Sequence, residues 1–149
     1  MKIAFFDTKA YDRPSFEHYG REQDLDFTFF ETKLNEKTAE LTQGFEGVCV
    51  FVNDTVNAEV IDILVKNGVK LLALRCAGYN NVDLNHAKGK LQVVRVPAYS
   101  PYAVAEHAMA LLLTSIRRIH KAYIRTRDFN FSLNGLTGFD LHGKTVGVI

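Results

Sequence analysis

The feature of this sequence that most constrains its fold is a regular alternation of short apolar runs with amphipathic segments over the first hundred residues. The apolar runs predict β-strands at Lys2–Phe6, Leu25–Phe30, Gly47–Val52, Lys70–Leu74 and Leu91–Val96. The segments between them predict helices at Arg13–Gly20, Asn35–Gln43, Asn57–Asn67 and Asp83–Lys88. Alternating strands and helices are joined by right-handed crossovers, which generate a parallel sheet with helices on both faces. We therefore predict an α/β fold with a flavodoxin-like, doubly wound parallel sheet.

A long helix follows these elements, from Tyr102 to about Arg125. Ser100 and Pro101 form a helix-start signal, because the serine oxygen can cap free N–H groups and the proline has its φ preset. The run 103–113 is apolar apart from Glu106 and His107, so nearly every face of the helix is apolar. Such a helix is normally enclosed by protein on several sides, and the run is too short to span a bilayer.

Composition excludes several classes of partner. The formal net charge is +1, which gives no electrostatic reason to expect binding to nucleic acid or to an anionic membrane. Cys49 and Cys76 lie in apolar surroundings and form no spacing motif, which predicts reduced, buried thiols. The apolar run at the start of the sequence is too short for a signal peptide. These features predict a cytoplasmic protein.

In a doubly wound sheet, ligands bind beyond the carboxyl ends of the strands. The most informative of these ends is the segment 75–81, Arg-Cys-Ala-Gly-Tyr-Asn-Asn. Gly78 permits a turn whose amides point outward, and Asn80, Asn81 and Asp83 can cap the helix that follows. Outward-pointing N–H groups beside a helix start favour a small anion such as a carboxylate. The other interpretation, an ordinary turn between strand and helix, remains open from the pattern alone.

Other polar residues suggest weaker alternatives. Asp7 and Asp54 each follow a strand, as in a phospho-acceptor receiver, but that chemistry also needs paired acids and a lysine after the last strand, where Pro97 stands. The five histidines have no metal-type spacing, so we predict no metal site. His107 is expected to be structural. The basic run 117–127 favours a solvated helix face, with an anion or partner site as the alternative.

Several segments resemble the D-2-hydroxyacid dehydrogenase family, and among its members the bacterial fermentative D-lactate dehydrogenases. They include Leu74–Asp83, Val94–Pro101, Ala103–Ala108, Arg117–Tyr123, Arg125–Leu133 and Gly135–Phe139, and the resemblance extends over essentially the whole chain. It implies reduction of pyruvate or a similar 2-oxo acid to the D-2-hydroxy acid with NADH as the hydride donor. The expected partner is therefore a small 2-oxo or 2-hydroxy acid, and the full-length protein is expected to be a homo-oligomer.

The resemblance also implies a domain organisation and a set of site residues. Residues 1–100 match a substrate-side lid domain, 101–127 an inter-domain crossing helix, and 128–149 the start of an NAD-binding Rossmann domain. The segment that matches Ala77, Gly78 and Tyr79 offers backbone amides to the substrate carboxylate. The expected pocket residues are Phe51 and Tyr99, and Val104 matches a residue near the nicotinamide. Relatives that carry Tyr in place of Phe51 have a hydroxyl that is missing here.

The resemblance makes one further expectation, about the end of the chain. Residues 142–149 match the first Rossmann strand, whereas the family's Gly-rich loop and its catalytic Arg, Glu and His belong to later sequence. We therefore expect no catalytic residue among these 149 residues. The chain is expected to be the amino-terminal part of the enzyme, inactive alone, with the apolar side of its long helix partly exposed. The alternative is a non-catalytic ligand-binding or regulatory domain derived from the same family.

Overall fold

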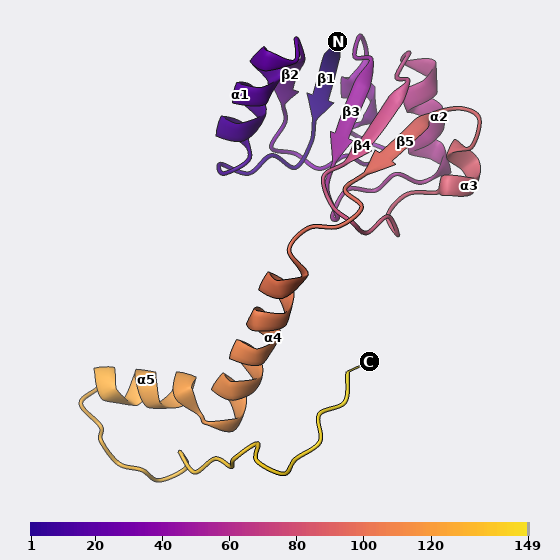
Figure 1. Cartoon of the computed structure of the whole chain (residues 1–149). Helices are drawn as coiled ribbons and strands as arrows, with labels where there is room; N and C mark the ends of the chain where they lie inside the picture. Colours follow the sequence, from indigo (N-terminus) through magenta and orange to yellow (C-terminus); the bar gives the residue numbers. More distant parts are fainter. Residues whose placement is uncertain (149) are drawn as a thin grey trace. The chain divides into compact units, whose positions relative to one another are not determined.

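A five-stranded sheet forms the centre of the first of two units in the molecule. The computed structural model describes residues 1–148, which divide into a compact unit spanning Met1–Tyr99 and a second unit that begins at Ser100. All strand pairs are parallel, and the order across the sheet is β2-β1-β3-β4-β5 (Figure 1). The strands are β1 (Lys2–Phe5), β2 (Asp26–Phe29), β3 (Gly47–Val50), β4 (Leu71–Leu74) and β5 (Gln92–Arg95). This is the flavodoxin-like order, so the predicted fold class is confirmed.

Helical elements cover both faces of the sheet. Helix α1 (Arg13–Glu22) places Phe16 against the smaller apolar cluster, on the face that carries Ile3, Phe5 and Cys49. The other face carries the larger cluster, because alternate strand residues point to opposite sides. It packs against α2 (Ala58–Lys66), α3 (Leu84–Ala87) and the 3-10 turn η1 (Ala39–Thr42). Strand β3 is buried at all four positions, as its continuous apolar run predicts.

The helix boundaries in this unit follow from capping residues. The Asn57 side chain accepts a hydrogen bond from the N–H of Val60 at the start of α2. Just beyond the helix, Gly68 has a φ of +89°, a conformation that favours glycine and ends the helix. Asp83 caps α3 in the same way, by accepting from the N–H of His86. The helices predicted at 57–67 and 83–88 are confirmed, with slightly shorter bounds.

The helix predicted over Asn35–Gln43 is wrong, because only the 3-10 turn η1 forms there. In the first half of this segment, side chains form hydrogen bonds with nearby backbone groups, which are then not available for the hydrogen bonds of a helix. Thr38 Oγ1 donates to the carbonyl of Lys33 at 2.7 Å and accepts from the N–H of Asn35 at 2.9 Å. Such local bonds compete with the helical hydrogen-bond pattern and favour a turn.

The second unit contains two helices where the sequence predicted one. Helix α4 (Pro101–Ile116) begins as expected, with Ser100 accepting from the N–H of Ala103. Arg118 then adopts a left-handed backbone with a φ of 55°, which interrupts the helix before α5 (Ile119–Arg127). A residue in that conformation cannot continue a right-handed helix. The prediction of a single helix over 102–125 is therefore wrong, because the helix is interrupted at Arg117 and Arg118.

Helix α4 is exposed along most of its length, although its sequence is apolar. Ile116 is its one buried residue, and Val104 and Leu111 are both more than half exposed. The predicted partial exposure of its apolar side is therefore confirmed. No helix within 1–148 is long and apolar enough to cross a membrane.

Residues 128–148 form neither helix nor strand. The strand expected over 142–149 is absent from residues 142–148, and Ile149 lies outside the described residues. A β-strand needs a hydrogen-bonded neighbour, and no strand of residues 1–148 pairs with this segment.

Both cysteines are buried, as predicted, and we expect both to be unreactive in the native protein. Burial raises the pKa of Cys49 to about 12, and burial also raises the pKa of Cys76. Since the thiolate is the reactive form, Ellman's reagent near neutral pH should modify neither residue in the folded chain. After unfolding in guanidinium chloride, both should react. Rapid modification of either thiol without denaturant would contradict this prediction.

Candidate functional site

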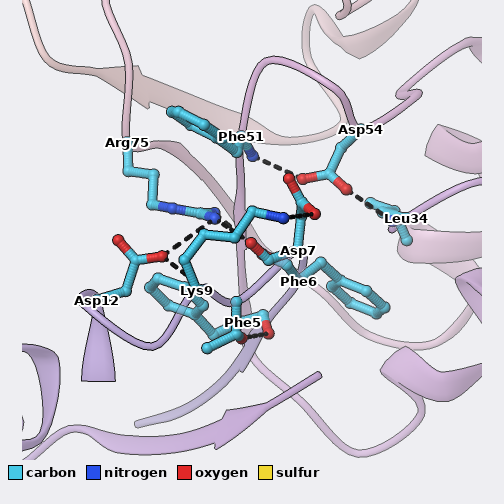
Figure 2. A network of polar contacts seen from close by, with 10 residues as sticks. Phe5, Phe6, Asp7, Lys9, Asp12, Leu34, Phe51, Asp54 and Arg75 are labelled. Atoms are coloured by element: carbon cyan, nitrogen blue, oxygen red, sulfur yellow. Dashed lines mark hydrogen bonds and ion pairs between the residues drawn. The ribbon is translucent and has the colours of Figure 1, made fainter. Parts of the chain in front are cut away.

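The carboxyl ends of β1, β3 and β4 bring polar and aromatic side chains from three distant parts of the sequence together. Asp7 follows β1, Phe51 follows β3, and Arg75 follows β4 (Figure 2). These three strands are neighbours in the sheet, so residues that directly follow them meet at one edge. This is the edge at which doubly wound folds bind ligands.

Arg75 is at the centre of this group. Its guanidinium donates to the carbonyl oxygens of Phe6, at 3.0 Å, and Asp7, at 2.6 Å, and lies 3.6 Å from a carboxylate oxygen of Asp12. It also lies 4.5 Å from the ring centre of Phe5 and 4.6 Å from that of Phe51. The side chain is only 9% exposed. Arg75 thus joins the ends of three strands and holds a positive charge close to the sheet edge.

Asp54 stabilises the loop after β3. It is buried, and its two carboxylate oxygens accept the N–H groups of Leu34 at 2.7 Å and Phe51 at 2.6 Å. Burial raises its pKa, although the two N–H groups oppose that rise. The Asn81 side chain adds bonds to the carbonyls of Phe51 and Asp54. A buried carboxylate engaged in this way is not free to attack a phosphodonor, so the geometry does not favour the receiver alternative.

Asp7 and Lys9 form a second charged pair at the same edge. The Lys9 ammonium lies 2.6 Å from one carboxylate oxygen of Asp7, and this hydrogen bond raises the pKa of Lys9. The second oxygen of Asp7 is buried and has no hydrogen-bond partner within residues 1–148. Asp7 also has a φ of 48°, an uncommon conformation for a residue other than glycine. The backbone therefore turns sharply as it leaves β1.

A pocket of about 450 Å³ opens beside this charged group. It is lined by Phe51, Val52, Arg75, Cys76 and Tyr99. The structure thus brings together the two predicted pocket residues, Phe51 and Tyr99. The sequence reasoning missed Arg75 and Cys76 as lining residues. The available signal was a lone arginine directly after an apolar strand, at an edge where ligands bind.

The loop 77–79 follows this pocket directly and carries the predicted anion-binding amides. Within residues 1–148, the N–H groups of Ala77, Gly78 and Tyr79 donate to no acceptor. Gly78 is exposed, its φ is not positive, and a Cβ added to it would meet no atom within 4 Å. The fold itself therefore does not require glycine at this position. Tyr79 lines a different hollow, of about 320 Å³, together with Arg95.

The remaining expected site features fall outside this pocket. Val104 lies on α4 in the second unit, where it offers an exposed apolar side chain.

A dinucleotide diphosphate needs the N–H groups of a turn between a strand and a helix, and residues 142–148 form neither element. The described residues therefore do not by themselves fit a dinucleotide. No group of acidic, histidine or cysteine side chains in residues 1–148 has the arrangement of a metal site.

Comparisons with known proteins agree on one family. The family model described as D-isomer specific 2-hydroxyacid dehydrogenase, catalytic domain, matches residues 3–141. A D-lactate dehydrogenase of Escherichia coli K12 is 55% identical over 150 residues, which cover all of this chain and 46% of that protein. The chain therefore spans less than half the length of this relative.

Solved structures give the same result. The apo-structure of D-lactate dehydrogenase from Escherichia coli matches 93% of this chain and 44% of its own, with a TM-score of 0.84 and 54% identity. The D-lactate dehydrogenase of Aquifex aeolicus, solved in complex with NAD and lactic acid, matches 93% of this chain and 41% of its own, with a TM-score of 0.72 and 28% identity. The chain therefore belongs to the D-isomer specific 2-hydroxyacid dehydrogenase family.

Proposed function

We propose that this chain supplies the substrate-binding side of an NAD-dependent D-lactate dehydrogenase, which reduces pyruvate to D-lactate. The observation that carries the proposal is the position of the three unpartnered amides of Ala77, Gly78 and Tyr79, directly after a pocket lined by Phe51, Arg75 and Tyr99. The names of the Escherichia coli relatives, and the NAD and lactic acid bound to the Aquifex aeolicus enzyme, support this choice of substrate and cofactor.

The chemistry of the pocket suits a small 2-oxo acid. Its carboxylate would accept hydrogen bonds from the amides of 77–79, and charge-assisted bonds of this kind are stronger than neutral ones. The Phe51 ring supplies an apolar wall for the methyl group, and the Arg75 guanidinium, which lies 3.6 Å from a carboxylate oxygen of Asp12, lines the same pocket. NADH, when bound by the full-length protein, supplies the hydride.

We further infer that the 149-residue polypeptide alone does not turn over substrate. Reduction of a ketone needs a hydride donor as well as a proton donor. Residues 142–148 form no turn between a strand and a helix that could hold the NADH diphosphate, and none of the five histidines lines the pocket. Binding of a substrate analogue and turnover are therefore expected to separate in this polypeptide.

Oxamate, a pyruvate analogue, tests the binding site. We expect its addition to ¹⁵N-labelled chain to shift the amide resonances of Ala77, Gly78 and Tyr79 in NMR spectra. Gly78→Val should weaken this binding by at least about tenfold, a loss of about 1.4 kcal/mol, because its side chain fills the space in front of the amides. The melting temperature should not change, since that space holds no protein atom.

Gly147→Val is the matched control, because Gly147 also has an ordinary φ and no atom within 4 Å of an added Cβ. This variant should bind oxamate as the parent chain does. If oxamate leaves the three amide resonances of the parent chain unmoved, the proposed carboxylate site is wrong.

A further inference from the structure

We propose that Arg95 is a positioning residue for the carboxylate site, because it sets the direction in which the N–H of Gly78 in loop 77–79 points. The inference rests on the proposed function for its ligand, but its geometry is independent of that function. Arg95 is the last residue of β5, where it pairs in register with Leu74 of β4. Arg95 is therefore on β5, the neighbour of strand β4, and loop 77–79 follows β4.

Arg95 contacts the loop at two points. Its Nη1 atom donates to the carbonyl oxygen of Ala77 at 2.8 Å. Its guanidinium carbon also lies 5.3 Å from the ring centre of Tyr79, within the range of a cation–π contact. One side chain thus contacts the first and the last residue of the loop.

The bond to the Ala77 carbonyl fixes an N–H group as well. A trans peptide group is planar, so its C=O and N–H point in opposite directions, and the described residues contain no cis peptide. When Arg95 holds the Ala77 oxygen, the N–H of Gly78 must point away from Arg95. Similarly, the Cys76 thiol donates to the Gly78 oxygen at 3.3 Å, which directs the N–H of Tyr79 to the opposite side. Together, Arg95 and Cys76 orient two successive peptide groups.

Packing does not replace these two contacts. Gly78 has no side chain, and a Cβ added to it would meet no atom within 4 Å, so side-chain packing at this residue does not hold the peptide groups beside it. Loss of the Arg95 bond should therefore let the Ala77–Gly78 peptide sample several orientations. A site whose donors are no longer preorganised binds its ligand more weakly, because binding must then include the cost of ordering the donors.

Arg95→Met tests this role, with Arg13→Met as the matched control. Arg13 also lies over an aromatic ring, 5.0 Å from the centre of Phe29, but it is on α1 and away from the loop. We expect R95M to weaken oxamate binding about fivefold, the effect of one lost hydrogen bond, and R13M to leave it unchanged. Arg95→Lys keeps a cationic donor and should restore most of the affinity. The melting temperatures of R95M and R95K should stay near that of the parent chain, because Arg95 is exposed.

A second readout needs no ligand. In R95M without oxamate, the Gly78 amide resonance should shift or broaden, and its hydrogen exchange rate should change, whereas R13M should leave both unaltered. The positioning role is overturned if R95M keeps the parent Gly78 resonance, or if it binds oxamate as tightly as the parent chain. If the parent chain binds no oxamate but the Gly78 resonance changes in R95M, the proposed function fails and the positioning role stands.

Discussion

Asp54→Ala should lower the free energy of unfolding by about 4 kcal/mol, the largest effect that we expect from a single substitution in this chain. Its carboxylate accepts the N–H groups of Leu34 and Phe51 and is 2% exposed. Alanine leaves the buried N–H of Leu34 and the partly buried N–H of Phe51 without this acceptor, and each such donor costs roughly 1–3 kcal/mol. The loops before η1 and after β3 should loosen together, because Asp54 bonds to both.

Urea unfolding, monitored by circular dichroism, measures the decrease in the free energy of unfolding. Asp26→Ala is the control, since Asp26 is also an acid of the same unit but is exposed and forms no side-chain hydrogen bond or ion pair among residues 1–148. That change should stay within about 0.5 kcal/mol of the parent chain. A change in the free energy of unfolding for D54A as small as that for the control would contradict this prediction. It would mean that the two N–H groups find other acceptors.

The second large effect concerns turnover. The purified 149-residue polypeptide should not oxidise NADH in the presence of pyruvate. This should hold even when the pyruvate concentration is as high as the oxamate concentration that shifts the amide resonances of loop 77–79. The reason is chemical: residues 142–148 form no turn between a strand and a helix that could hold the NADH diphosphate, and no histidine lines the pocket to donate a proton. The loss of NADH absorbance at 340 nm measures the rate.

The Escherichia coli D-lactate dehydrogenase, which is 55% identical to this chain, is the positive control in the same assay. A pyruvate-dependent loss of absorbance that co-purifies with the 149-residue polypeptide would contradict our inference. If oxamate binds but no turnover occurs, substrate binding and chemistry are separate properties of different parts of the protein.

The general architecture could be predicted because the signals for it are local. A run such as Val48, Cys49 and Val50 has no polar side chain to expose, which indicates a buried strand. Asn57 marks the start of the following helix, and Gly68 marks its end. Two of the three wrong predictions, the helix at 35–43 and the continuous helix at 102–125, had causes that such local signals do not contain. Thr38 binds the carbonyl of Lys33 and so diverts the chain from a helix, and Arg118 takes a left-handed backbone in the middle of a helix-favouring run.

The lining of the candidate pocket was predictable only in part. Phe51 and Tyr99 were expected from the family resemblance, and they do line one pocket. Arg75 was missed, because its role depends on the carbonyls of Phe6 and Asp7, which are 69 and 68 residues away in the sequence. No local pattern indicates which backbone oxygens a lone arginine will contact. Contacts of this kind appear only when the strand order is known.

The position of Arg75 between two rings has a consequence for how this protein can evolve. Phe5 belongs to the smaller apolar cluster, whereas Phe51 packs against the larger one, and the guanidinium contacts both rings. Phe51 is also a wall of the pocket. A substitution of Phe51 that widens the pocket therefore also removes a contact by which Arg75 joins the two halves of the core. Substitutions that widen the pocket at this position should arise in lineages that have first acquired stabilising changes elsewhere.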